Sequence, residues 1–247
     1  MVQRLKSVLK TVQLRLILKS CIFAGLLLWA RTSDFMPLPV LVFILASFVF
    51  YFRNHTQNNF ESFSSFLVFV ASSLYSISQL SHPEFLLLSV IFFSFLFYIS
   101  LGIKEFAFTH RFEWNYIKNL FLVYSVFMSY FLADKYFLFP LKFLAVFLAL
   151  FFVVREWLLW LYASFPKRYN LAALVFSFLM LQIVWAISLL PLGFVNSATL
   201  AMVIFYIGMD FLIGHFRGLI TKKLIIKNLI VLVLSVFVIF FFTKWKI

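Results

Sequence analysis

Residues 224–242 read LIIKNLIVLVLSVFVIFFF, an apolar run interrupted only by Lys227, Asn228 and Ser235. A helix that crosses a membrane needs about 20 mostly apolar residues, because the hydrocarbon core of a bilayer is about 30 Å thick. The length and composition of this run therefore predict a transmembrane helix.

The composition of the whole chain agrees with this prediction. Of its 247 residues, 65% are hydrophobic and 12% are charged, and the mean hydropathy is +1.07. Soluble domains carry about 45–50% apolar and about 25% charged residues. A soluble fold of this size needs a polar exterior and could not cover so much apolar surface. The chain is therefore expected to be an integral membrane protein with an all-α fold, a polytopic helical bundle.

Nine apolar runs are long enough, or nearly long enough, to cross the membrane. The loops between them are too short to form a soluble domain, so residues 1–247 are expected to form a single integral membrane domain. Residues 1–13 are a basic segment whose Arg4 and Thr11 share one helical stripe, as expected of an amphipathic helix at the membrane surface. The predicted spans lie near 14–30, 38–52, 63–80, 85–103, 116–133, 137–154, 171–190, 195–213 and 224–242.

The distribution of Lys and Arg residues predicts the orientation of the chain. Most of the 21 fall on one side of the alternating spans, which the positive-inside rule assigns to the cytoplasm. The N-terminus is then inside and the C-terminus outside, in what we expect to be a bacterial cytoplasmic membrane. Because these cations follow the ends of apolar runs, anionic lipid headgroups are their expected partners and nucleic acid is not. The Lys and Arg residues on the opposite side are Arg31, Lys135, Lys142, Lys244 and Lys246.

One face of the third predicted span is polar. Ser65, Ser72, Ser76 and Gln79 fall within about 120° of a helical wheel, so they share one side of the helix. Two interpretations remain open. The face packs closely against neighbouring helices through small residues and hydroxyl hydrogen bonds, or it lines a hydrated cavity. Either interpretation predicts that this helix lies inside the bundle.

An aspartate, Asp210, interrupts the eighth predicted span. A carboxylate within the membrane is costly, so it is expected to face protein or water and to have a partner. Tyr206, one turn earlier, and Arg217, seven residues later, are the candidate partners on its face of the helix. Asp210 is then either a structural anchor between helices or part of a functional cluster. Nearby, Gly214 and Gly218 form a small-xxx-small pair, which favours close helix packing.

Other polar residues are also predicted to face the cytoplasm. If they converge, they could hold a phosphate group or supply acid–base chemistry. The alternative is a set of ion pairs at the membrane interface. The candidate inner-face cluster comprises Glu105, His110, Arg111, Arg155, Glu156, Asp210, His215 and Arg217.

No motif in the sequence identifies a reaction, a cofactor or a metal site. The HExxH, GxSxG, P-loop and dinucleotide-binding patterns do not occur, and a single cysteine excludes paired-cysteine metal ligands and disulfides within the chain. The favoured hypothesis is a non-enzymatic membrane module that assembles with another membrane protein or binds anionic lipid at its basic face. The alternatives are an enzyme that acts on a lipid or isoprenoid phosphate at the cytoplasmic leaflet, and a small-solute carrier or channel that uses Asp210.

Overall fold

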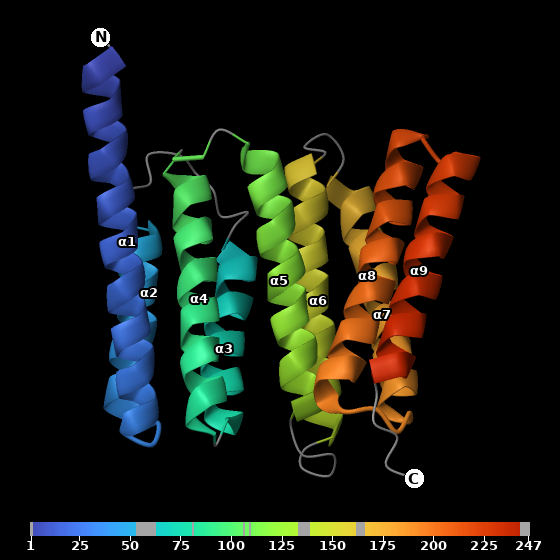
Figure 1. The fold of residues 1–247 in the computed structure, drawn as a ribbon, viewed down its shortest axis with the longest axis horizontal. Coiled ribbons are helices and arrows are strands. Elements are labelled where there is room, and N and C mark those ends of the chain that lie inside the picture. The colour runs from blue at the N-terminus through green and yellow to red at the C-terminus, as the bar shows by residue number, and fades with distance from the viewer. Residues whose placement is uncertain are drawn as a thin grey trace. The chain divides into compact units, whose positions relative to one another are not determined.

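A computed structural model of the chain describes residues 2–52, 63–80, 82–105, 107–108, 110–132, 139–161 and 166–242, without the side chains of residues 2–11, 139, 166–167 and 242. The described residues form nine helices and no strand (Figure 1). The prediction of an all-helical fold is confirmed for this part of the chain. The helices are α1 (Val2–Thr32), α2 (Pro37–Phe52), α3 (Phe63–Gln79), α4 (Pro83–Lys104), α5 (Arg111–Leu132), α6 (Phe139–Leu161), α7 (Pro166–Ser188), α8 (Phe194–Arg217) and α9 (Lys222–Phe242).

Six of the described helices are long and apolar enough to cross a membrane, and they indicate a membrane-integral protein. They are α4, α6, α7, α8, α9 and the Val12–Thr32 part of α1. Both α2 and α3 are apolar but have only 16 and 17 residues. Although α5 has 22 residues, Arg111, Glu113 and Lys118 make its first half more polar. A membrane crossing by α2, α3 and α5 therefore stays a prediction.

Some helix boundaries differ from the sequence prediction. Because α6 continues past 154 to Leu161 and α8 continues past 213 to Arg217, Glu156 and Gly214 are helical rather than in loops. The prediction ended these spans at charged or glycine-containing segments, but a helix keeps its backbone hydrogen bonds while its charges reach toward water. At the other end of the chain, α1 is a single helix that begins well before the predicted span. No break separates the basic segment from that span.

Proline and glycine set several helix ends. The helices α2, α4 and α7 begin at Pro37, Pro83 and Pro166, where the missing N–H is not needed and the fixed φ suits the first turn. The end of α8 is followed by Gly218, whose φ of 64° lies in the left-handed region that glycine adopts without steric cost. The Gly218 N–H donates to the His215 carbonyl at 3.0 Å and closes the helix.

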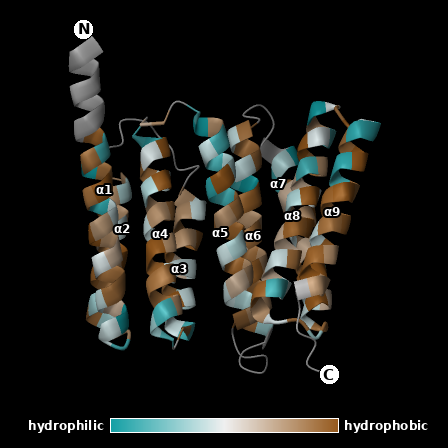
Figure 2. Cartoon of the chain, viewed as in Figure 1, coloured by the Kyte–Doolittle hydropathy of each residue, from teal (hydrophilic) through white to brown (hydrophobic). Residues whose placement is uncertain are grey.

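The chain divides into two compact units, unit 1 (Met1–Leu122) and unit 2 (Val123–Ile247). The boundary falls inside α5, so no linker in the sequence marks it. In each unit the helices are mostly hydrophobic along their middle, and hydrophilic residues gather toward their ends (Figure 2). This is the pattern expected of helices that pass through a lipid layer.

Stacked aromatic rings form the core of unit 1, in which α1 contacts α2, α3 and α4. The ring centroid of Phe23 lies 4.3 Å from that of Phe97, 5.0 Å from that of Phe43 and 5.6 Å from that of Phe69. Aromatic pairs at such distances contribute about 0.5–1.5 kcal/mol each beyond the area they bury. These four phenylalanines therefore serve packing.

Consecutive helices of unit 1 run antiparallel, so α1 and α3 end on one side and α2 and α4 end on the other. At one end, Arg31 Nη2 donates a hydrogen bond to Leu80 O at 3.0 Å and joins the ends of α1 and α3. At the other end, Lys104 Nζ donates to Tyr51 O at 3.2 Å and joins the ends of α4 and α2. These bonds are the ones expected of four helices that alternate in direction.

In unit 2, α7 contacts α6 and α8, and α8 contacts α9. The ring centroid of Phe205 on α8 lies 5.5 Å from that of Phe176 and 6.3 Å from that of Trp157. A Cβ atom on Gly208 would lie 2.6 Å from the Phe176 ring, so glycine allows α7 and α8 to approach closely. Of the six long apolar stretches, that of α9 is the least covered, with only 11% of it buried.

Candidate functional site

Each unit has one end at which Lys and Arg side chains gather. The basic end of unit 1 consists of Lys19, Lys104, Glu105 and Lys118. The basic end of unit 2 consists of Asp210, Arg217, Lys222, Lys223 and Lys227. Both sets lie on the side of the predicted spans that the sequence assigns to the cytoplasm.

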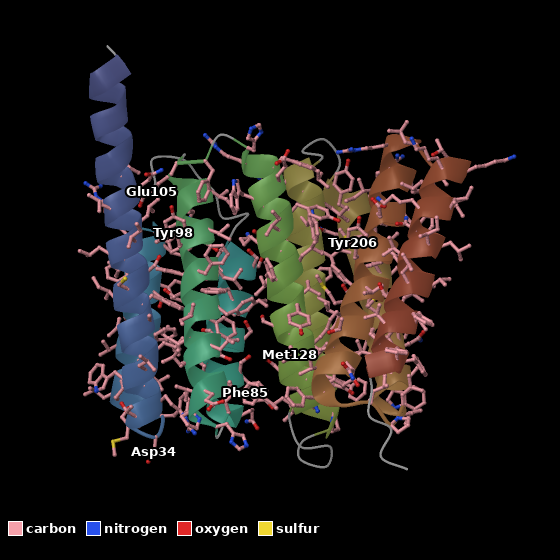
Figure 3. The ribbon with its side chains drawn as sticks, viewed as in Figure 1. Asp34, Phe85, Tyr98, Glu105, Met128 and Tyr206 are labelled. Carbon is pink, nitrogen blue, oxygen red and sulfur yellow. The ribbon has the colours of Figure 1, made fainter. Side chains whose placement is uncertain are left out.

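A buried ion pair joins α1 to α4 at the basic end of unit 1. Lys19 Nζ donates to Glu105 Oε1, and the two side chains are only 11% and 12% exposed. Figure 3 shows Glu105 at the end of α4, beside α1. Removing a charge from water costs several kcal/mol, roughly, in desolvation free energy. Two buried charges are therefore stable only when each neutralises the other. The contact is therefore structural.

The Lys104 ammonium is also held inside unit 1. Besides its bond to the Tyr51 carbonyl, it lies 3.4 Å from the centroid of the Tyr51 ring and 4.3 Å from that of Phe52. The negative faces of these rings attract a cation, more strongly where water is excluded. Tyr51 stacks in turn on Phe66, with 3.8 Å between ring centroids. Lys104 thus joins α4 to α2.

Lys118 lies beside a small cavity at the basic end of unit 1. It is 8% exposed, and Ser65 of α3 and Ser100 of α4 line the cavity with it. The cavity volume of about 10 Å³ is room for one water molecule and not for a lipid headgroup. Ser100 donates its hydroxyl proton to Leu96 O at 2.8 Å, so its oxygen remains an acceptor.

The predicted polar face of α3 is divided between this cavity and helix packing. Ser65 lines the cavity, whereas Ser72 and Ser76 are buried farther along the helix and Gln79 is exposed at its end. Ser72 Oγ donates to the Phe69 carbonyl of its own helix at 3.0 Å. One side of α3 is buried in unit 1, whereas Phe63, Leu67 and Tyr75 along its other side are exposed. The prediction that this helix lies inside the bundle stays a prediction.

The connection between α4 and α5 folds back on α4, which the sequence did not predict. The Phe108 ring lies so close to Gly102 that a Cβ atom there would overlap it. Phe108 also stacks on Trp114 at 4.9 Å and meets the ring of Tyr98 at 5.9 Å between centroids. The signal that could have indicated this approach is Gly102 itself, a glycine in an otherwise apolar helix end.

Asp210 pairs with Lys227 across α8 and α9. Lys227 Nζ donates to Asp210 Oδ2 at 2.9 Å, and the ammonium lies 5.7 Å from the ring centroid of Tyr206, which Figure 3 labels on α8. The pair is more accessible than the one in unit 1, since the Lys227 side chain is 50% exposed and that of Asp210 is 22% exposed. Spacing along α8 indicated Tyr206 and Arg217 as candidate partners. It missed Lys227, because a partner on another helix depends on how the two helices are aligned.

The two predicted packing glycines have different roles. Gly214 is buried, and a Cβ atom on it would lie 3.2 Å from the side chain of Leu224, so it allows α8 and α9 to approach closely. Gly218 turns the chain, and no described atom lies within 4 Å of the position its Cβ would take. Thr221 Oγ1 accepts a hydrogen bond from the Leu224 N–H at 3.3 Å and caps the start of α9.

The tip between α8 and α9 combines exposed cations with exposed apolar side chains. Arg217, Lys222 and Lys223 are exposed, and so are Leu219 and Ile220, at 59% and 50%. Within the described part of the chain, Lys222 and Lys223 have no ion-pair partner. Their charges are therefore available to an external anion.

The remaining candidates of unit 2 lie on α6 and α8. Arg155 Nε donates to Asn170 Oδ1 at 2.8 Å and joins α6 to α7. The next residue, Glu156, is 8% exposed, so it belongs to the packed part of α6. His215 is exposed and contacts the ring of Phe216 beside it.

The eight predicted inner-face residues are thus divided between the units. Glu105, His110 and Arg111 belong to unit 1 and the others to unit 2. His110 is exposed, and Arg111 is half-buried at the start of α5. Among the residues that the structure describes, no group of three His, Cys, Asp or Glu side chains is arranged to hold a metal ion.

Comparison of the chain with models of protein families, with curated proteins and with solved structures found no match. The function is therefore inferred from the residues of the chain itself.

Proposed function

We propose that the chain is a polytopic membrane protein of a bacterial cytoplasmic membrane, whose two units form one domain with nine spans, the N-terminus inside and the C-terminus outside. Its function is that of a non-enzymatic module that binds anionic lipid at its basic inner face. Six long apolar helices support the membrane location. Assembly with another membrane protein is compatible with α9, whose apolar stretch is only 11% buried.

The observation that carries the lipid-binding function is the exposed tip between α8 and α9. Leu219 and Ile220 would be unfavourable in water, and Lys222 and Lys223 would be unfavourable in hydrocarbon. A tip that carries both kinds of side chain fits the headgroup layer, where apolar groups reach the acyl chains and cations reach the phosphates. Each Lys or Arg close to an anionic membrane surface contributes about 1 kcal/mol of attraction.

Lys19, Lys104 and Lys118 do not carry this function, because their side chains are held within unit 1. Lys19 is paired with Glu105, and Lys104 is held by the Tyr51 carbonyl and by two rings. Lys118 borders a cavity that holds no more than about one water molecule. Anionic lipid is therefore assigned to the basic end of unit 2.

Native mass spectrometry of the detergent-purified chain, titrated with phosphatidylglycerol or phosphatidylcholine, tests lipid binding. The wild-type chain is expected to retain phosphatidylglycerol in preference to phosphatidylcholine. The Lys222→Gln/Lys223→Gln variant is expected to lose most of this preference. The matched control, Arg15→Gln/Arg111→Gln, removes the same charge from unit 1 and is expected to keep it. Equal losses in the two variants would show diffuse attraction only and would overturn the assignment to the tip.

Labelling of single cysteines from outside intact cells tests the orientation. Leu189 and Leu219 are both exposed, at 68% and 59%, and follow the ends of α7 and α8. In a Cys21→Ser background, Leu189→Cys is expected to react with a membrane-impermeant maleimide in intact cells, and Leu219→Cys only after the cells are broken open. The reverse pattern would invert the proposed topology.

A further inference from the structure

We infer that the lipid held at the basic end of unit 2 is a glycerophospholipid, with its phosphate at Lys222 and Lys223 and a glycerol ester carbonyl at Lys227. This inference rests on the proposed lipid-binding function and names the chemical class of the lipid. The alternatives are an isoprenoid phosphate and free inorganic phosphate, which share the phosphate but have no glycerol ester.

Two lysines of α9 point to the same side at two depths. Lys223 and Lys227 are four residues apart, so they lie within about 40° of each other around the helix and about 6 Å apart along it. Lys223 is next to the tip, and Lys227 is one turn deeper toward the middle of the span. A ligand that lies along this side of α9 would contact the Lys223 ammonium near the tip and the Lys227 ammonium one turn deeper.

The net charge differs at these two depths. Lys222 and Lys223 have no ion-pair partner in the described part of the chain, so the level of the tip is cationic. One turn deeper, Asp210 neutralises Lys227 across 2.9 Å. A cationic level suits a phosphate, and a neutral level that still offers N–H donors suits an uncharged carbonyl oxygen. A glycerophospholipid presents these groups in the same order, because its ester carbonyls lie a few bonds deeper than its phosphate.

Lys227 retains a donor for such a carbonyl. An ammonium group has three N–H donors, and Asp210 Oδ2 accepts one of them. With Tyr206 as a second neighbour, a third N–H is still left, and half of the Lys227 side chain is exposed. The carbonyl could therefore bind without breaking the contact between α8 and α9.

The same side of α9 continues as an apolar surface on which acyl chains would lie. Ile230 and Leu234 follow Lys227 at intervals of three and four residues, and they are 52% and 58% exposed. Little of this helix is covered by the chain itself, since 11% of its apolar stretch is buried. Acyl chains attached through the two esters would extend along this surface toward the middle of the span.

A comparison of two lipids on the wild-type chain tests the ester contact. Diacyl phosphatidylglycerol and its dialkyl ether analogue carry the same headgroup and chains, but the ether lacks the carbonyl oxygens. Native mass spectrometry, with inorganic phosphate as a third probe, is expected to show about fivefold tighter binding of the diacyl lipid, the effect of one hydrogen bond. Inorganic phosphate should bind more weakly than either lipid, because it gains nothing from the apolar side of α9.

The Asp210→Asn/Lys227→Met variant removes the donor without leaving an unpaired charge. Its diacyl and ether lipids are expected to bind equally well, while the preference over phosphatidylcholine remains. The Lys222→Gln/Lys223→Gln control should weaken both lipids by the same factor. If the wild-type chain binds the diacyl and ether lipids equally, the ester contact is wrong and lipid binding stands. If the wild-type chain binds neither lipid in preference to phosphatidylcholine, both the ester contact and the proposed lipid-binding function are wrong.

Discussion

The two basic ends arise from one sequence pattern and differ in what their charges do. In unit 1, Lys19 and Glu105 form a pair whose side chains are 11% and 12% exposed. In unit 2, Lys227 is 50% exposed, and Lys222 and Lys223 are exposed without an ion-pair partner among the described residues. A lysine at the end of an apolar run therefore indicates the side of the membrane, but only packing decides whether it stabilises the fold or meets a ligand.

The largest effect on stability is expected from breaking the buried pair of unit 1. Glu105→Gln leaves the Lys19 ammonium buried without its carboxylate, which costs about 3–5 kcal/mol. Thermal unfolding in detergent, followed by tryptophan fluorescence, should show a clear fall in Tm. A Tm within experimental error of the wild type would mean that the basic end of unit 1 is as accessible as that of unit 2.

A smaller loss is expected where the α4–α5 connection folds back on the basic end of unit 1. Gly102→Ala places a methyl group against the Phe108 ring, and overpacking of this kind costs about 1–3 kcal/mol. The matched control is Gly25→Ala in α1, where no described atom lies within 4 Å of the new Cβ. Alanine there should be neutral or stabilise by up to about 1 kcal/mol. Equal Tm values for the two variants would contradict the close packing of Phe108 on α4.

Gly218→Ala should affect unit 2 moderately. An alanine at a φ of 64° costs about 1–2 kcal/mol, because its Cβ approaches the following carbonyl oxygen. The substitution should lower the Tm slightly, and Gly218→Asn should lower it less, because asparagine tolerates the left-handed region better. An alanine variant more stable than the asparagine variant would argue against this turn.

The smallest effect is expected from the exposed pair of unit 2. Asp210→Asn removes the charge opposite Lys227, but Lys227 lies near the end of its span, and its half-exposed side chain can turn toward the hydrated headgroup layer. Pairs in such a hydrated setting contribute only about 0–1 kcal/mol. The Tm should therefore change far less than in Glu105→Gln, measured under the same conditions. A loss as large as that of Glu105→Gln would mean that the two ends do not differ in the way described.

Sequence reasoning predicted the helices well because their signal is local. Apolar runs such as residues 224–242 are visible without any knowledge of neighbours, and the described helices follow them. Contacts between helices and exact helix ends were harder to predict. Lys227 was not recognised as the partner of Asp210, and Glu156 was placed in a loop although it is packed within α6. Gly218 was interpreted as a packing residue and turns the chain instead. The Asp210–Lys227 pair depends on how two helices are aligned, which spacing along one helix does not contain. The other two misses arose because α6 and α8 continue beyond the apolar runs from which their ends were predicted.

The most direct test of the difference between the two ends is the shift in Tm on adding phosphatidylglycerol, because a ligand that binds the folded state raises its stability. The wild-type chain should show such a shift. Lys222→Gln/Lys223→Gln should keep the starting Tm and lose the shift, whereas Glu105→Gln should start at a lower Tm and keep the shift. A tip variant that retains the full shift, together with a Glu105 variant that loses it, would contradict the assignment of lipid to unit 2 and of structure to unit 1.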